Sequence, residues 1–204
     1  MKLIMENWKR YLLAETSFEQ DGKIMFIVRS NQIEGYDTPE EEVKEAIEGL
    51  EQGYPLRYVT QNPHIYSHLA GLEAAESGHS SVADILKIHR AMGSGALESG
   101  APGMLRVGGA ESEHGTKYTQ PEDVPAALEW WTQQDWQDPF EAHTIYELIH
   151  PFDDGNGRSG RIILAAMLDF NFDRTNSYIG SDYFISLDKA SAGHPFFNTP
   201  WAAH

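Results

Sequence analysis

The most chemically dense stretch of the sequence is HPFDDGNGRSGR, which runs from His150 to Arg161. It combines a histidine, two aspartates, an asparagine, two arginines and three glycines. Glycines weaken a helix, and so many polar side chains do not form a hydrophobic core. A segment that costs stability wherever it lies is typical of a functional site.

The spacing of these residues indicates a site for phosphate groups. Proline after His150 disfavours the α conformation at that histidine, so the preceding helix is expected to end there. The next helix then starts near Gly157, and its first N–H groups and positive dipole end attract anions. Arg158 and Arg161 share one helix face and add donors for more than one phosphate, while a carboxylate at Asp154 suits Mg²⁺. The stretch therefore predicts a site for a nucleoside triphosphate with magnesium.

Other interpretations of the glycine-rich stretch fit less well. Aligned with a calcium-binding loop, it places Phe152 and Ile163 at ligand positions where carboxylates belong. A Walker phosphate loop is absent, because no lysine followed by serine or threonine closes the glycines. A capped helix-loop-helix with incidental charges remains as a purely structural alternative, which the density of costly residues disfavours.

Composition narrows the class of protein further. A chain of 204 residues is long enough for one good core, and its formal charge of -16 argues against nucleic acid or an anionic membrane as a partner. The absence of cysteine excludes disulfides and zinc-thiolate sites. The start, MKLIMENWKRYLL, has no long apolar run, so neither a signal peptide nor a membrane span is expected. We expect a cytoplasmic protein.

The elements that position the site are expected to be almost entirely helical. Helical periodicity predicts a short helix near residues 8–13 and a second over about 24–33 that ends at EGY. Thr38 is expected to cap the helix of TPEEEVKEAIEGL. Further helices are expected at about 63–75, 81–92, 121–134, 139–149 and 157–170. Residues 101–119 are the exception, and their glycines favour a small β-hairpin.

At this point the sequence resembles a known family. The opening stretch fills every fixed position of HxFx(D/E)GNGRxxR, the signature of Fic-domain proteins of the Fic/Doc superfamily, and the resemblance extends over roughly 81–172 through ADILKIHRAMGSG, PGMLR, PEDVPAALEWW and AHTIYELIHPF. It implies an all-α Fic fold, a helical bundle with a small β-hairpin flap. We expect an N-terminal helical extension over 1–60 and the Fic domain over 61–204.

The resemblance implies a protein adenylyltransferase, which transfers AMP from ATP to a Tyr, Ser or Thr hydroxyl of a target protein. His150 would take the hydroxyl proton, and Asp154 would hold Mg²⁺. ATP would be bound by Gly155, Asn156, Gly157, Arg158 and Arg161. Phe152 would point into the core and anchor the loop. Kinases and phosphocholine transferases of the wider family depart from this signature, which favours AMP as the group transferred.

The expected hairpin resembles the family's flap, which pairs with a segment of the target protein by its main chain. Its target-positioning residues would be Met104, Leu105, Arg106, Val107, Thr116, Lys117 and Tyr118. A surface hairpin without this role is the alternative.

A second motif precedes the core. Ser30, Glu34 and Gly35 in SNQIEGY fill every fixed position of (S/T)xxxE(G/N), which in the family marks an inhibitory helix. By this resemblance Glu34 would pair with Arg161 and leave ATP badly aligned for attack. Without the family, Glu34 would be read as an exposed carboxylate at a helix end.

Alternatives to AMP transfer remain open from the sequence. A hydrolase could remove AMP from a modified protein with Glu34 aligning water, and a non-catalytic module could sense nucleotides or bind targets. Self-modification is a further expectation for a transferase. His64 and His68 lie four apart without an apparent third ligand, so we expect surface histidines rather than a metal site.

Overall fold

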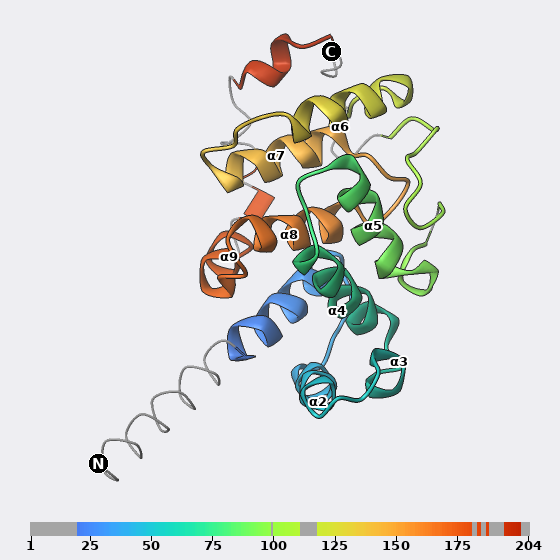
Figure 1. Ribbon diagram of the computed structural model, residues 1–204, viewed down its shortest axis with the longest axis vertical. Helices are drawn as coiled ribbons and strands as arrows, with labels where there is room; N and C mark the ends of the chain where they lie inside the picture. The colour runs from blue at the N-terminus through green and yellow to red at the C-terminus, as the bar shows by residue number, and fades with distance from the viewer. Residues whose placement is uncertain are drawn as a thin grey trace, which may run out of the picture.

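The computed structural model describes residues 20–98, 100–110, 118–180, 183–184, 187 and 194–200. Within these ranges residues 20–33 are helical and no strand occurs, so the fold is an all-α bundle (Figure 1). The further α-helices are α2 (Glu40–Glu51), α3 (Leu56–Val59), α4 (Pro63–Glu76), α5 (Val82–Met92), α6 (Val124–Thr132), α7 (Pro139–Ile149), α8 (Asn156–Met167) and α9 (Phe172–Tyr178). Short 3-10 helices are η1 (Ser94–Ala96), η2 (Pro121–Asp123) and η3 (Pro195–Asn198).

Helix α8 is the central element of the bundle. It packs against α4, α5, α7 and α9, and Figure 1 shows it between α7 and α4. Gly71 allows α4 to approach closely, because a Cβ atom there would come within 2.6 Å of Ile162 Cδ1. The central position buries both arginines of the signature, with Arg158 0% and Arg161 1% exposed. Buried guanidinium groups require hydrogen-bond partners, and both arginines have them.

The helix of residues 20–33, called helix 20–33 below, belongs to the same core. Phe26 and Ile27 are both 0% exposed and join the main hydrophobic cluster. Polar bonds join it to α9, since the Asn176 side chain donates to the Gly22 carbonyl at 2.8 Å and Arg29 donates to the Asn176 carbonyl at 2.9 Å. Helix 20–33 is therefore an integral part of the bundle.

The expected helices are found with small shifts of their ends. Those expected at 63–75, 81–92 and 139–149 are confirmed as α4, α5 and α7. The segment 121–134 divides into η2 and α6. Helix α8 stops earlier than expected, because Asp169 and Phe170 adopt left-handed backbone angles with φ of 53° and 56°.

Other details differ from expectation. Thr38 is not the cap of α2: the N-cap is Pro39, and the buried Thr38 hydroxyl has no hydrogen-bond partner. The short helices α3 and α9 were not predicted, although Asn171 caps α9 by accepting a bond from the Arg174 N–H. The helix expected near residues 8–13 lies outside the described residues.

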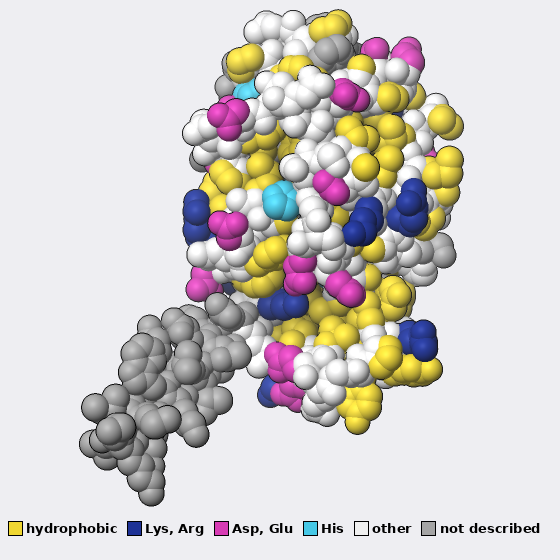
Figure 2. Space-filling model, in the orientation of Figure 1, with side chains coloured by type: hydrophobic (Ala, Val, Ile, Leu, Met, Phe, Trp, Pro, Cys, Tyr) yellow, Lys and Arg dark blue, Asp and Glu magenta, His cyan; other side chains and the backbone are white. Residues whose placement is uncertain are grey.

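The β-hairpin flap is not seen in the described residues. Residues 104–107 and 118 adopt no strand, and residues 111–117, which include Thr116 and Lys117, lie outside the described part of the chain. On the face shown in Figure 2, Lys and Arg side chains stand in small groups among acidic ones. Among the described residues, no helix combines the length and apolar character that crossing a membrane requires.

Candidate active site

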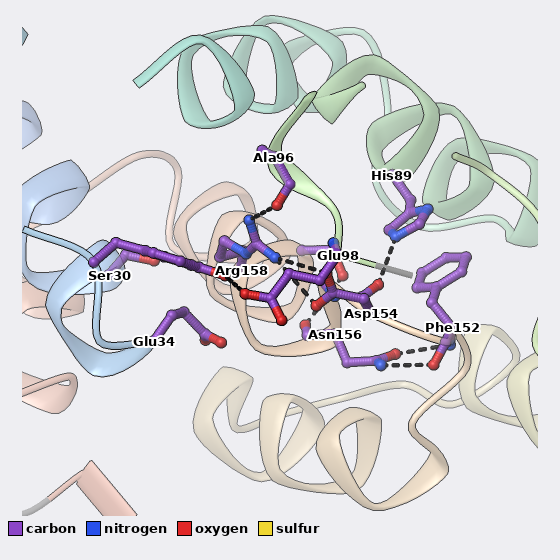
Figure 3. Close-up of polar contacts among 12 residues, drawn as sticks. Ser30, Glu34, His89, Ala96, Glu98, Phe152, Asp154, Asn156 and Arg158 are labelled. Atoms are coloured by element: carbon purple, nitrogen blue, oxygen red, sulfur yellow. Dashed lines mark hydrogen bonds and ion pairs between the residues drawn. The ribbon is translucent and has the colours of Figure 1, made fainter. Parts of the chain in front are cut away.

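The loop between α7 and α8 is closed by its own side chains (Figure 3). Asn156 accepts a hydrogen bond from the Phe152 N–H at 2.8 Å and donates to the Phe152 carbonyl at 2.8 Å. Phe152 is 0% exposed, so it anchors the loop in the core. The Asn156 amide thus shapes the loop from within, and one of its two N–H donors is engaged on the Phe152 carbonyl.

His89 on α5, which was not a candidate site residue from the sequence, supports this loop. The His89 ring stacks on Phe152 with centroids 3.6 Å apart. Its Nδ1 accepts a bond from the Gly103 N–H at 2.8 Å, so its Nε2 carries the proton and donates to the Asp154 carbonyl at 2.9 Å. His89 thereby joins the signature loop to the segment around Gly103.

The N-terminus of α8 offers backbone donors to an anion. Gly155 is its N-cap with φ 78° and ψ 11°, and the Ser159 N–H makes the first helical bond to the Gly155 carbonyl at 2.9 Å. The N–H groups of residues 156–158 precede that bond and point out of the helix end. The positive φ favours glycine at position 155, where an added Cβ atom would lie 2.8 Å from Leu97 Cδ2.

Arg158 and Asp154 form an ion pair at this helix end. Arg158 donates to the two Asp154 carboxylate oxygens at 3.2 and 3.3 Å and to the Ala96 carbonyl at 2.5 Å. Asp154 also accepts a bond from the Glu98 N–H at 2.6 Å. The proposed phosphate ligand and the proposed magnesium ligand thus neutralise each other in this structure.

Arg161 instead meets Ser30 of helix 20–33 and Glu34, which directly follows this helix. It donates to the Glu34 carboxylate at 2.5 Å, to the Ser30 hydroxyl at 2.8 Å and to the Ser30 carbonyl at 3.0 Å. A Cβ atom at Gly157 would lie 2.5 Å from the same Glu34 oxygen. The Glu34 carboxylate therefore lies directly against the first turn of α8, where the helix end attracts an anion.

The backbone holds Glu34 in this place. Gly35, with φ 82°, and the Tyr36 N–H, which donates to the Asn31 carbonyl at 3.0 Å, end helix 20–33 in a Schellman turn. A carboxylate at a helix C-terminus is electrostatically unfavourable, and Arg161 and the N-terminus of α8 offset this cost. The structure thus brings the segment of Ser30, Glu34 and Gly35 to Arg161, the last residue of the signature.

His150 is held in an uncommon backbone conformation next to α8. It caps α7 with φ 51° and ψ 63°, a left-handed geometry that costs a non-glycine residue on the order of 1 to 3 kcal/mol. Its ring stacks on Tyr118 with centroids 3.9 Å apart. Burial, together with the charge of Arg106, lowers the pKa of His150 to about 4. The imidazole is therefore neutral at pH 7 and able to accept a proton.

Among the residues expected to form the flap, Arg106 binds the turn at His150. Arg106 is 2% exposed, and it donates from Nε to the His150 carbonyl at 2.6 Å and through NH2 to the Thr119 carbonyl. Its own N–H donates to the Pro151 carbonyl at 3.0 Å. Arg106 thus fixes the strained turn, and neither its side chain nor its N–H is free to pair with a target. Met104 and Val107 are exposed, at 63% and 91%, and Leu105 packs against the core.

Buried neutral histidines predict a pH-dependent stability. Burial is the main cause that lowers the pKa to about 3 for His68 and His143 and to about 4 for His89. An unfolded histidine titrates near 6.5, so between about pH 6.5 and 4 the unfolded chain binds more protons than the folded one. The free energy of unfolding should fall with decreasing pH across this interval, by up to about 1.4 kcal/mol per pH unit for each histidine.

Urea denaturation at pH 7.5 and pH 5.5 tests this expectation. The His143→Gln variant should show a shallower dependence than the wild type, because one of the titrating groups is gone. Equal free energies of unfolding at the two pH values would contradict it.

Among the described residues, no three His, Asp, Glu or Cys side chains cluster in a way that could hold a metal ion. Asp154 is the carboxylate of the signature loop at this helix end. Mg²⁺ suits such a site, since it commonly takes one or two carboxylates and completes its shell with phosphates and water.

The chain is similar to known proteins in sequence. Residues 79–168 match the model of the Fic/DOC family. A protein of Aquifex aeolicus named "Probable protein adenylyltransferase" is 46% identical over 52 residues, a segment that is 25% of this chain and 16% of that protein.

Solved structures extend the likeness to the fold. A Fic family protein from Desulfovibrio desulfuricans matches with a TM-score of 0.61 and 25% identity over 95% of this chain and 66% of its own. A Fic domain containing signaling protein from Bacteroides thetaiotaomicron matches with a TM-score of 0.56 and 20% identity over 95% of this chain and 84% of its own. The family match contains the whole signature loop, so residues 79–168 form a domain of the Fic/DOC family.

Proposed function

We propose that this chain transfers AMP from ATP to a Tyr, Ser or Thr hydroxyl of a target protein. The observation that carries the proposal is the N-terminus of α8, which offers backbone donors and against which the Glu34 carboxylate lies. His150 is neutral, precedes this helix end in the same loop and is influenced by the charges of Glu34 and Asp154. The Fic/DOC domain and the name of the Aquifex relative support AMP transfer at the level of the family.

Phosphate binding would use the backbone more than the side chain of the signature asparagine. The N–H groups at residues 156–158 would bind phosphate oxygens, with Gly155 and Gly157 giving the space. Arg158 would turn from Asp154 to a phosphate, and Arg161 would exchange the Glu34 carboxylate for another. Each exchange replaces one charge-assisted bond with another, so both arginines stay paired.

The chemical step needs a base on the side of the target. Nδ1 of His150 is buried, so a target hydroxyl must approach Nε2. Nε2 takes the hydroxyl proton as the oxygen forms a bond to the α-phosphorus, and the bond from that phosphorus to the β-phosphate bridging oxygen breaks. The products are the phosphodiester of the target and pyrophosphate. Donors at the end of α8 stabilise the charge that develops on the phosphates.

The Asp154 carboxylate can bind magnesium, although in this structure it is paired with Arg158. Its side chain is 22% exposed and both oxygens accept bonds from Arg158. It gains a free lone pair for a cation once Arg158 turns to phosphate. Bound magnesium would supply positive charge at the α- and β-phosphates and ease the departure of pyrophosphate.

Glu34 would keep the resting enzyme inactive. A γ-phosphate and the Glu34 carboxylate compete for the same Arg161 donor and the same space beside Gly157. ATP bound beside Glu34 would hold its γ-phosphate out of place, and the α-phosphorus would then be badly aligned with the attacking oxygen.

Labelled ATP tests the proposed reaction directly. The protein and its Glu34→Gly variant should incorporate label from ATP marked at the α-phosphate, either into a target in a lysate or into themselves. ATP marked at the γ-phosphate should leave no label on protein. Transfer of the γ-label would make the chain a kinase and overturn the proposal.

Asp154→Asn should reduce AMP transfer and raise the Mg²⁺ concentration that gives half-maximal activity, by about 10-fold, because the charge that attracts the cation is lost. The amide oxygen can still accept the Glu98 N–H, so the loop keeps that bond. A magnesium titration of transfer at fixed ATP measures the effect. An unchanged magnesium titration would remove Asp154 from this role.

A further inference from the structure

Ser30 joins three helices through a chain of buried hydrogen bonds. On α4, His68 Nδ1 lies 3.0 Å from the His64 carbonyl, and His68 Nε2 lies 2.7 Å from the Ser30 hydroxyl. On α8, Arg161 Nε lies 2.8 Å from the same hydroxyl. Ser30 and His68 are both 0% exposed, so water does not supply substitutes for these bonds. This corrects the expectation that His68 is a surface residue.

The chain of bonds has one consistent direction. The His64 carbonyl only accepts, so His68 Nδ1 carries the proton and Nε2 keeps a lone pair. Ser30 therefore donates its hydroxyl proton to Nε2 and accepts the Nε–H of Arg161. His68 sets the orientation of the Ser30 hydroxyl, and that orientation is the one Arg161 requires.

Helix 20–33 contacts Arg161 in two separate ways. Ser30 accepts from Nε and from one N–H of NH2, while Glu34 accepts from NH2 at the outer end. The Ser30 bonds are buried, whereas the Glu34 side chain is 26% exposed at the last turn of the helix. Because the helix is packed into the core, Glu34 can swing away while Ser30 stays in place.

We propose that His68 is a positioning residue for ATP binding: through Ser30 it fixes the guanidinium of Arg161 where a γ-phosphate can meet it, whether or not Glu34 is paired. The inference rests on the proposed function, since it assigns the γ-phosphate to Arg161. It divides the second motif into a fixed part, Ser30, and a mobile part, Glu34. Loss of the fixed part should weaken ATP binding rather than activate the enzyme.

Variants in the Glu34→Gly background separate these roles. His68→Ala and Ser30→Ala should raise the KM for ATP about 5-fold with a smaller change in kcat, because a mobile arginine must be ordered at each binding event. His68→Gln should restore the low KM, since its amide oxygen can accept the Ser30 proton near the position of Nε2. Ser67→Ala is the matched control, because Ser67 is also a 0% exposed serine and its hydroxyl has no hydrogen-bond partner.

A second readout does not depend on ATP. The NMR signal of the Arg161 Nε–H should be protected from solvent exchange in the Glu34→Gly protein and in its Ser67→Ala form. It should be lost in the Ser30→Ala and His68→Ala forms and return with His68→Gln. An unchanged signal in the His68→Ala form would overturn the inference, as would a lost signal with an unchanged KM. If the Glu34→Gly protein binds no ATP, the proposed function fails, and the positioning role for ATP fails with it.

Discussion

The His150→Ala variant is expected to lose AMP transfer by about 10²- to 10⁴-fold while it still binds ATP, because the imidazole acts on the hydroxyl proton and not on the phosphates. Two features of the structure prepare His150 for this role. Its pKa is lowered to about 4, so it is unprotonated at neutral pH, and the stacked Tyr118 ring and the Arg106 bond fix its ring and backbone. The loss should appear in kcat, with the affinity for ATP nearly unchanged.

Incorporation of α-labelled AMP and calorimetric titration with ATP measure the two quantities separately. His79→Ala serves as the control, because this histidine lies before α5 and outside the site. Transfer by the wild type should vary little between pH 8 and pH 6, since a base with a pKa near 4 stays unprotonated over that range. Strong residual transfer by His150→Ala would remove the histidine from the role of base.

Local signals in the sequence explain why the boundary between α7 and α8 could be predicted. The proline after His150 marks the end of one helix, and α7 ends there. The next helix was expected to start near Gly157, and α8 starts one residue earlier, at Asn156. The placement of Glu34 against Arg161 came from the family resemblance alone. No local pattern connects two residues that are 127 positions apart.

The partners of the polar side chains could not be read from the sequence in the same way. The phosphate role expected of Asn156 gave no sign that its amide also meets the backbone of Phe152, a contact set by the exact turn of the loop. Arg106 was expected in a flap, yet it lies buried on the carbonyls of His150 and Thr119. Such bonds depend on how separate segments meet in three dimensions, which neither periodicity nor spacing records.

One signal for His68 was present in the sequence. Helix α4 reads PHIYSHLAGLEAAE, with small or apolar residues on nearly every side and few charges. A helix that lacks a polar face is buried, and a histidine within it needs hydrogen-bond partners in the core. The position of His89 gave a weaker signal, because α5 is amphipathic and its exposed face carries Lys87 and Arg90.

The Glu34→Gly variant is expected to transfer AMP, to targets and to itself, at least about 10-fold faster than the wild type, because a charge-assisted bond of ~1.5 to 3 kcal/mol no longer holds Arg161. The structure shows what the Glu34 carboxylate occupies. Glu34 takes an NH2 donor of Arg161 and the space beside Gly157, so its removal frees both the charge and the volume that a γ-phosphate needs. The Ser30 bonds to Arg161 remain, which keeps the arginine in place for ATP.

Three comparisons isolate this effect at equal protein and Mg²⁺ concentrations. Gln32→Gly introduces a glycine into the same exposed last turn without removing the carboxylate, and it should not activate. Glu34→Gly combined with Arg161→Ala should fall back to low activity, because the released partner no longer exists to orient ATP. A hydrolase that aligned water with Glu34 would instead lose AMP removal in the single variant. If Glu34→Gly is no more active than the wild type, the Glu34 to Arg161 pair is a structural contact and the enzyme is not held inactive by it.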